Sequence, residues 1–152
     1  MEWQRRRVLV TGGASFIGSH LVDALVERGA DVRVVDDLSS GLLSHIQQHL
    51  DAGTVEFLKG DLRDSGIVRR ATEGMNVVFH LAADHGGRGY VDTYQAGPAS
   101  NLVLDGIVFW EALKAGAAKV VYASSGCVYP NYLQGNPDED LYLTEDTVGP
   151  PC

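Results

Sequence analysis

A glycine-rich turn early in the chain combines residue types that could hold a diphosphate. Residues 11–18 read Thr-Gly-Gly-Ala-Ser-Phe-Ile-Gly, between an apolar run and a stretch with helical spacing. In such a turn Gly12 permits a tight bend, and Gly18 lets the following helix pack closely on the strand. A diphosphate then binds the unpaired amides and the positive dipole end at the helix N-terminus. A glycine cluster alone also fits a plain strand-to-helix turn, so its context decides.

A carboxylate further along the chain favours the binding interpretation. Asp36 ends the second apolar run, after the helix that the glycine-rich turn opens. At that position an acid can accept hydrogen bonds from the adenosine ribose hydroxyls of a dinucleotide. The same negative charge disfavours the additional phosphate of NADP. Turn, helix, strand and acid together predict an NAD site, with NADP as the less favoured cofactor.

Short β-rich runs alternate with helical stretches along the chain. Nearly continuous apolar runs are typical of strands buried on both faces of a parallel sheet. Strands are expected at 7–11, 32–36, 55–58, 77–82 and 119–123, with helices after Ile17 and around 42–50 and 64–73. This alternation predicts an α/β fold, a doubly wound parallel sheet of the Rossmann type with strand order 3-2-1-4-5. We expect an NAD(P)-binding domain at 1–129 and an irregular acidic C-terminal segment at 130–152.

The helix expected near 100–115 has almost no polar face. Its apolar positions are Leu102, Val103, Leu104, Ile107, Val108, Phe109, Trp110, Ala112 and Leu113. A helix that is apolar all round must be covered on more than one side. The sheet covers one side, and we expect a second copy of the chain to cover another, which predicts a homo-oligomer. Burial within a single copy is the alternative.

Charge and composition argue against several classes of partner. The 152 residues carry a net charge of −8 at pH 7, so the surface repels the phosphate backbone of nucleic acids. No apolar stretch approaches the ~20 residues that cross a bilayer, and no membrane association is expected. The two cysteines, Cys127 and Cys152, suggest no disulfide framework and suit a reducing cytosol. A cytoplasmic protein without a metal site is therefore expected.

In these residues the chain resembles the extended short-chain dehydrogenases/reductases, specifically the sugar-nucleotide epimerases and dehydratases. Their fingerprint is Thr-Gly-x-x-Gly-x-x-Gly, which places Gly12 and Gly18 on its first and third glycines. The middle glycine is Ser15 here, a departure that predicts crowding where the backbone approaches the diphosphate. By the same resemblance, Asp61 and Leu62 would flank the adenine. The implied cofactor contacts are Gly12, Ser15, Phe16, Ile17, Gly18, Asp36, Asp37, Asp61, Leu62, Leu81, Ala82, Ala83 and Asn101.

The stretch 122–130 resembles the family's active-site strand and its continuation. Ser125 stands where the catalytic serine or threonine binds the reacting sugar hydroxyl, although it could simply end a strand. Cys127 matches the acid/base cysteine of the GDP-mannose 3,5-epimerases, which implies proton transfer beside a transient ketone. A small buried cysteine is the equally favoured alternative. A nucleotide-diphosphate sugar is the implied substrate, with contacts from a glycine-rich loop at Gly86, Gly87 and Arg88.

The family's central catalytic pair is a tyrosine with a lysine four residues later. None of the six tyrosines in this sequence has lysine at that offset. In the family this tyrosine takes the sugar hydroxyl proton while hydride passes to NAD. We therefore expect an N-terminal part of an epimerase or dehydratase, truncated before the Tyr/Lys helix and the substrate domain, and inactive alone. The alternatives are a non-catalytic dinucleotide-binding or regulatory module and one half of a split enzyme.

Overall fold

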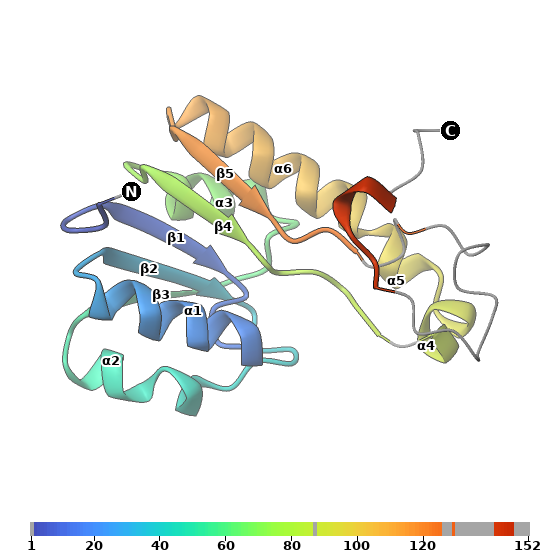
Figure 1. Ribbon diagram of the computed structural model, residues 1–152, viewed down its shortest axis with the longest axis horizontal. Coiled ribbons are helices and arrows are strands. Elements are labelled where there is room, and N and C mark those ends of the chain that lie inside the picture. The colour runs from blue at the N-terminus through green and yellow to red at the C-terminus, as the bar shows by residue number, and fades with distance from the viewer. Residues whose placement is uncertain (1, 87, 126–128, 130–141, 148–152) are drawn as a thin grey trace. The chain divides into compact units, whose positions relative to one another are not determined.

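A five-stranded parallel sheet organises residues 1–122, the first of the two units into which the chain divides (Figure 1). Its strands are β1 (Arg7–Thr11), β2 (Asp31–Asp36), β3 (Val55–Lys59), β4 (Val77–His80) and β5 (Lys119–Tyr122). They lie in the order β3-β2-β1-β4-β5, and each neighbouring pair is parallel. The doubly wound α/β fold and its predicted strand order are therefore confirmed.

The computed structural model describes residues 2–86, 88–125, 129 and 142–147. The second unit comprises residues 123–152, within which Glu145–Thr147 form the short 3₁₀ helix η4. Most of the predicted acidic segment, residues 130–141 and 148–152, lies outside the described residues. The assignment of 1–129 to a cofactor-binding domain stays a prediction.

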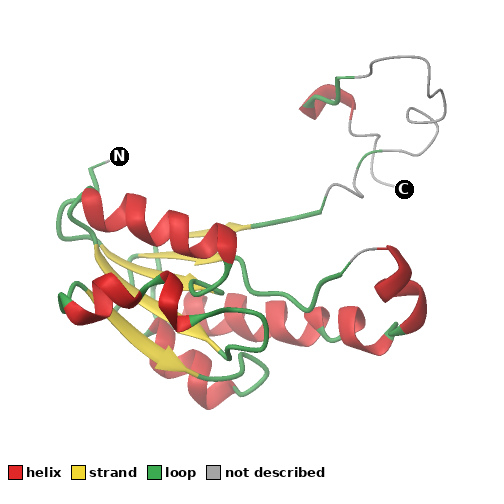
Figure 2. Ribbon diagram, turned by 90° about the horizontal axis from the view of Figure 1, so that it is seen from below, coloured by secondary structure: helices red, strands yellow, loops and turns green. Residues whose placement is uncertain are grey.

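Helices cover both faces of the sheet, as Figures 1 and 2 show. The covering helices are α1 (Phe16–Glu27), η1 (Leu43–His45), α2 (Gln47–Asp51), α3 (Ser65–Thr72) and α6 (Asn101–Lys114). Two short helices, α4 (Arg88–Thr93) and α5 (Ala96–Ala99), precede α6 and lie away from the sheet (Figure 1). On one face Val22 of α1 packs in a cluster with Val10 of β1. On the other face Val108 of α6 packs in a cluster with Leu9 of β1. Successive residues of a strand point to opposite faces, so burial of both faces explains the nearly continuous apolar runs.

Local contacts explain where several helices begin and end. Asp64 caps α3, because its carboxylate accepts a hydrogen bond from the Gly66 amide at 2.7 Å. At the other end of α3, the Arg33 guanidinium donates to the backbone carbonyls of Arg70, Ala71 and Glu73. Gly29 follows α1 with φ +77°, a left-handed conformation that favours glycine at helix ends.

Three elements differ from the expected pattern. β4 ends at His80 rather than at 82, because the Leu81 and Ala82 amides donate to the Thr11 hydroxyl instead of to a neighbouring strand. The helix expected at 42–50 is divided into η1 and α2 at Ile46, whose φ of −121° is not helical. The glycine-rich stretch expected to be a loop leads into α4, which begins at Arg88.

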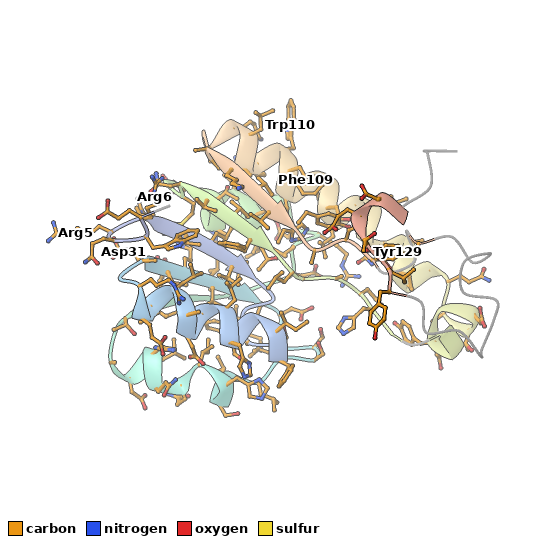
Figure 3. All side chains as sticks on the ribbon, viewed as in Figure 1. Arg5, Arg6, Asp31, Phe109, Trp110 and Tyr129 are labelled. Atoms are coloured by element: carbon orange, nitrogen blue, oxygen red, sulfur yellow. The ribbon has the colours of Figure 1, made fainter. Side chains whose placement is uncertain are left out.

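α6 is the helix predicted near 100–115, and the described residues cover one of its sides. Leu104, Val108 and Ala112 are buried in the cluster on the sheet. The large apolar side chains exposed on this helix are Leu102, Val103, Phe109, Trp110 and Leu113. Leu102 is 81 % exposed and Trp110 60 % exposed, and Figure 3 shows Trp110 projecting away from the sheet. The apolar outer side therefore has no cover within the described part of the chain.

Candidate functional site

A crevice of about 390 Å³ lies at the carboxyl ends of the strands, where the connections after β1 and β4 lead away to opposite faces. Open parallel sheets bind ligands at this kind of switch point. Its lining comes from the ends of β1, β2, β3 and β4 and from the start of α6: Gly12, Ser15, Val35, Asp36, Asp37, Ser39, Ser40, Gly60, Asp61, Leu62, Arg63, Leu81, Ala82, Ala83, Asp84, His85, Tyr90, Ser100 and Leu104. Many of the predicted cofactor residues thus meet in one cavity.

Two of the three glycines of the turn, Gly12 and Gly18, are required by close backbone contacts. Gly12 has φ +70°, and a Cβ atom there would lie 3.0 Å from the Ala82 nitrogen. A Cβ atom on Gly18 would collide with the Gly12 carbonyl oxygen and lie 2.7 Å from the Gly13 Cα. The first glycine therefore lets β1 approach the end of β4, and the last lets α1 begin directly on the turn. A side chain at either position would therefore occupy space that the backbone of the turn and of the residues just after β4 already fills.

Ser15 precedes α1 as its N-cap but does not cap it with its side chain. Its hydroxyl instead donates to the Gly12 carbonyl oxygen at 2.6 Å. The first amides of a helix have no intrahelical acceptor. Because the serine hydroxyl turns back to Gly12, the amides of Phe16, Ile17 and Gly18 keep no side-chain cap and are available to an anion at the positive end of the dipole.

Asp36 ties the end of β2 to the glycine-rich turn. One carboxylate oxygen accepts from the Ala14 amide at 3.0 Å, and the other accepts from the Leu38 amide at 2.9 Å. Asp36 is only 7 % exposed, yet it lines the crevice. An ionised carboxylate offers about four acceptor positions, so these two bonds leave capacity for hydroxyl groups of a ligand.

The turn is also fixed from its other side by a residue that sequence reasoning missed. The Ala14 carbonyl oxygen accepts from the Leu42 amide at 3.0 Å and from the His45 Nδ1 at 2.8 Å. Ala14 thus has its amide bound to Asp36 and its carbonyl bound to η1 and the residue before it. No motif marked His45, because its contact depends on how the segment after β2 folds back.

The remaining wall on the β3 side carries an ion pair. The Arg63 guanidinium binds the Asp61 carboxylate, with Nη2 and Oδ2 2.7 Å apart. Hydrogen bonding from Arg63 lowers the pKa of Asp61 below its usual value. Asp37, beside Asp36, accepts from the Ser39 amide at 2.8 Å. Leu62 is buried at 4 % exposure beneath this wall. Carboxylates therefore dominate the charge of this half of the crevice.

Asn101 lies at the start of α6 and binds the backbone of the loop after β4. Its Oδ1 accepts from the Asp84 amide at 2.8 Å, and its Nδ2 donates to the Asp84 carbonyl at 2.8 Å. The Tyr90 hydroxyl donates to the Asp84 carboxylate at 2.8 Å, which raises the pKa of Tyr90. Asn101 therefore holds this loop in place. Tyr90, which ends the stretch expected to form a glycine-rich substrate loop, belongs to α4 and also lines the crevice.

A chain of hydrogen bonds lies behind the crevice and joins residues that the sequence did not mark as a group. Thr11 Oγ1 and His80 Nδ1 are 2.7 Å apart, and His80 Nε2 is 3.1 Å from Asp105 Oδ1. The Tyr122 hydroxyl donates to the other Asp105 oxygen at 2.9 Å. Two features of the sequence could have indicated this group. Polar residues end the apolar strands β1, β4 and β5, and one acid, Asp105, interrupts the apolar stretch of α6.

The predicted chemistry-bearing residues are described only in part. Ser125 follows β5 in the second unit, so the structure does not test its role. Cys127 and Gly87 lie outside the described residues. A Cβ atom on Gly86 would lie 2.5 Å from the Tyr90 ring, and Arg88 is the first residue of α4. The catalytic and substrate assignments therefore stay predictions.

Within residues 2–86, 88–125, 129 and 142–147, no cluster of three or more His, Cys, Asp or Glu side chains could hold a metal ion. The helices in these ranges are too short or too polar to span a bilayer.

Comparison with known proteins adds to this geometry. Residues 8–151 match the model of a family described as the NAD dependent epimerase/dehydratase family. A putative UDP-glucose 4-epimerase of Methanocaldococcus jannaschii is 39 % identical over 131 residues, which are 83 % of this chain and 41 % of the relative. A 3 beta-hydroxysteroid dehydrogenase/Delta 5-->4-isomerase of Mycobacterium tuberculosis is 36 % identical over 132 residues, 80 % of this chain and 32 % of the relative. GDP-mannose 3,5-epimerase 1 of Oryza sativa is 29 % identical over 137 residues, 86 % and 34 % of the two chains.

Solved structures give the same picture. An epimerase from Methanothermobacter thermautotrophicus superposes with a TM-score of 0.80 at 32 % identity, covering 97 % of this chain and 42 % of its own. A dTDP-glucose 4,6-dehydratase of Streptomyces venezuelae, solved with NAD bound, has a TM-score of 0.68 at 30 % identity, covering 75 % and 38 %. The chain therefore spans between about a third and two-fifths of the length of these relatives.

Proposed function

Because this chain belongs to the NAD-dependent epimerase/dehydratase family, we propose that its crevice binds NAD. The observation that carries the proposal is the placement of Gly12, uncapped α1 and Asp36 around one cavity. The diphosphate would bind the first amides of α1, and the adenosine ribose hydroxyls would donate to the Asp36 carboxylate. Asp61 and Leu62 would flank the adenine, and Leu81 to Ala83 would line the path toward the nicotinamide.

We propose NAD rather than NADP as the cofactor. Asp36 and Asp37 adjoin each other at the end of β2, where the ribose would lie. A phosphate on that ribose would bring two further negative charges beside these carboxylates, and repulsion between like charges disfavours it. Arg63 is the cation of this wall, and its guanidinium is already paired with Asp61.

For the whole protein we propose a nucleotide-diphosphate sugar as substrate. A related UDP-N-acetylglucosamine 4-epimerase of Methanobrevibacter ruminantium was solved with UDP-N-acetylmuramic acid, with a TM-score of 0.79 at 31 % identity. Bound NAD would accept hydride from the sugar's C4 and return it after inversion. Ser125 would bind the reacting hydroxyl, Cys127 would exchange a proton beside the ketone, and contacts to the sugar nucleotide would come from Gly86, Gly87 and Arg88.

We further propose that this chain does not complete that cycle alone. The sequence has no tyrosine followed by lysine at the family's spacing, so the base for the sugar hydroxyl proton is missing. Epimerisation of UDP-glucose or GDP-mannose by the purified chain would contradict this proposal. A hydroxysteroid should be assayed beside these sugar nucleotides, because a 3 beta-hydroxysteroid dehydrogenase is among the relatives.

Self-association through α6 is also proposed. Leu102, Gly106, Trp110 and Leu113 recur at helical spacing along its outer side. A Cβ atom on Gly106 would meet nothing within 4 Å, so a second helix could approach the backbone there. We propose that a second copy of α6 packs antiparallel on the first and crosses it at Gly106. Leu102 and Val103 of one helix would then contact Trp110 of the other.

Calorimetric titration of the purified chain tests the cofactor proposal. We expect NAD to bind with measurable heat, NADP to bind more weakly, and both to compete for one site. UDP-glucose and GDP-mannose are titrated separately, with and without NAD, to find whether this chain holds any of the sugar-nucleotide site. A folded chain that binds neither dinucleotide would overturn the proposal, and a preference for NADP would overturn the role given to Asp36.

A further inference from the structure

Four polar residues form a continuous hydrogen-bonded chain across the carboxyl ends of three strands. Thr11, His80 and Tyr122 are directly paired in register on β1, β4 and β5. In parallel strands, residues in register point to the same face. That face is covered by α6, from which Asp105 reaches between His80 and Tyr122.

The hydrogen bonds of Thr11 determine where the protons lie. The Leu81 and Ala82 amides each donate to Thr11 Oγ1 at 3.1 Å. A hydroxyl oxygen has two acceptor positions, so both are used and the hydroxyl proton must be donated elsewhere. The atom in reach is His80 Nδ1, at 2.7 Å. Nδ1 is therefore the bare nitrogen of a neutral imidazole.

The other ring nitrogen of His80 then carries the proton. Nε2 lies 3.1 Å from Asp105 Oδ1, and the His80 side chain is fully buried. No solvent is available to take over that bond, so the carboxylate is the acceptor that makes this tautomer favourable. The second Asp105 oxygen accepts from the Tyr122 hydroxyl at the solvent-exposed end of this network.

We propose that Asp105 is a positioning residue for the dinucleotide crevice. By accepting from His80 Nε2, it fixes the tautomer in which Thr11 can receive both the Leu81 and the Ala82 amide. Those two amides hold the end of β4 against the turn at Gly12, which has no room for a Cβ atom on that side. The expected effect of Asp105 on NAD affinity rests on the proposed NAD binding. Its expected effect on the hydrogen bonds of His80 and Thr11 does not.

Loss of the acceptor should reverse the proton arrangement. Without Asp105, a proton on Nε2 would be buried and unsatisfied, so the tautomer with the proton on Nδ1 becomes preferable. His80 would then donate to Thr11, whose oxygen already accepts two amides. One amide must lose its partner, and the Leu81–Ala82 backbone at the cofactor wall would become less fixed.

The test compares three variants of the full 152-residue chain. Asp105→Ala removes the acceptor, Asp105→Asn keeps an acceptor oxygen without the charge, and Tyr122→Phe removes only the outermost hydrogen bond. Three quantities are measured: the ¹⁵N shifts of the His80 ring, the amide exchange rates of Leu81 and Ala82, and the dissociation constant for NAD. The first two do not depend on whether the chain binds NAD.

For Asp105→Ala we expect the opposite His80 tautomer, faster exchange at Leu81 or Ala82, and a dissociation constant raised about tenfold. Asp105→Asn and Tyr122→Phe should stay close to the wild type in all three measurements. If Asp105→Asn loses as much as Asp105→Ala, the charge rather than the acceptor matters and the proposal is wrong. Should Asp105→Ala not fold, the wild-type ring decides: a proton on Nδ1 overturns the assignment.

The two proposals can fail separately. A wild-type chain that does not bind NAD refutes the proposed function, while the ring tautomer and the amide exchange still decide the role of Asp105. A chain that binds NAD with the same affinity when Asp105 is alanine keeps the proposed function and refutes the positioning role.

Discussion

The Asp36 carboxylate accepts a hydrogen bond from the Ala14 amide at 3.0 Å, which joins the end of β2 to the turn after β1. The residue proposed to bind the ribose thus also holds the turn proposed to bind the diphosphate. One side chain therefore shapes both the proposed ribose site and the proposed diphosphate site before any ligand binds. Preorganisation of this kind reduces the ordering cost of binding.

Replacing Asp36 should therefore change both stability and affinity. Asp36→Ala leaves the buried Ala14 amide and the Leu38 amide without their acceptor, and we expect the free energy of unfolding to fall by about 2 kcal/mol. Urea denaturation measures this loss, and calorimetry should show weaker NAD binding with less discrimination against NADP. For stability, Asp37→Ala is the control, because Asp37 is exposed and the hydrogen bonds to its carboxylate come from the neighbouring Ser39. For affinity the control is Asp51→Ala, an exposed carboxylate on α2 that does not line the crevice. A loss of stability in Asp37→Ala, or a loss of NAD affinity in Asp51→Ala, equal to that in Asp36→Ala would contradict the special role of Asp36.

The fold could be predicted from the sequence because it depends on local patterns. Apolar runs gave the five strands, and the switch between helical and strand spacing gave their order. Gly12 and Gly18 were predictable for the same reason, since only glycine tolerates the contacts that this turn makes. Asp36 lines the crevice, its role as a ribose ligand stays a prediction, and its bond to Ala14 was not foreseen.

The missed contacts depend on register between distant strands. Thr11 and His80 are 69 positions apart in the chain and become neighbours only when β1 pairs with β4. The cofactor contact expected of Asn101 stays a prediction, whereas the binding of its side-chain amide to the Asp84 backbone was not foreseen. Side-chain amides bind whichever backbone the fold brings near, and single-sequence patterns carry no information on that partner.

Ser15 stands where the family fingerprint has its middle glycine, and the effect of this difference on NAD affinity can be tested. Its hydroxyl is bonded to Gly12, but its side chain still lines the crevice. We expect Ser15→Gly to tighten NAD binding roughly threefold, because the backbone can then approach the diphosphate more closely. Ser15→Ala separates the two parts of the side chain: if it behaves as the glycine variant does, the hydroxyl is the obstacle. Weaker binding by Ser15→Gly, measured by calorimetry, would show that the hydroxyl supports the turn.

The burial of His80 predicts a pH dependence of stability. Burial lowers the pKa of His80, and attraction to Asp105 only partly offsets this. The groups around its ring are Thr11 on β1, Asp105 and Phe109 on α6, and Tyr122 on β5. The pKa in the folded chain is thus below that in the unfolded chain, about 6.5. Stability is fully present above that pH and declines as pH falls toward the folded-state pKa.

Urea denaturation between pH 8 and pH 5 measures this slope, which should reach up to about 1.4 kcal/mol per pH unit below pH 6.5. His80→Asn removes the titrating group and should flatten the curve in this window. His20→Asn, at an exposed position on α1, should keep the wild-type slope. Asp61, whose pKa is lowered, contributes only near and below pH 4 and does not overlap. An unchanged slope in His80→Asn would contradict the assignment.

The exposed side of α6 predicts that one charged substitution controls the oligomeric state. Trp110 is 60 % exposed beside the open surface at Gly106. If two copies bury this surface, Trp110→Glu places an unpaired charge in an apolar contact, and the molar mass from light scattering should fall to that of one chain. Leu42→Glu is the matched control, because Leu42 is 57 % exposed and lies outside α6, before η1. A wild type that is already monomeric, or equal dissociation in both variants, would rule out α6 as the interface.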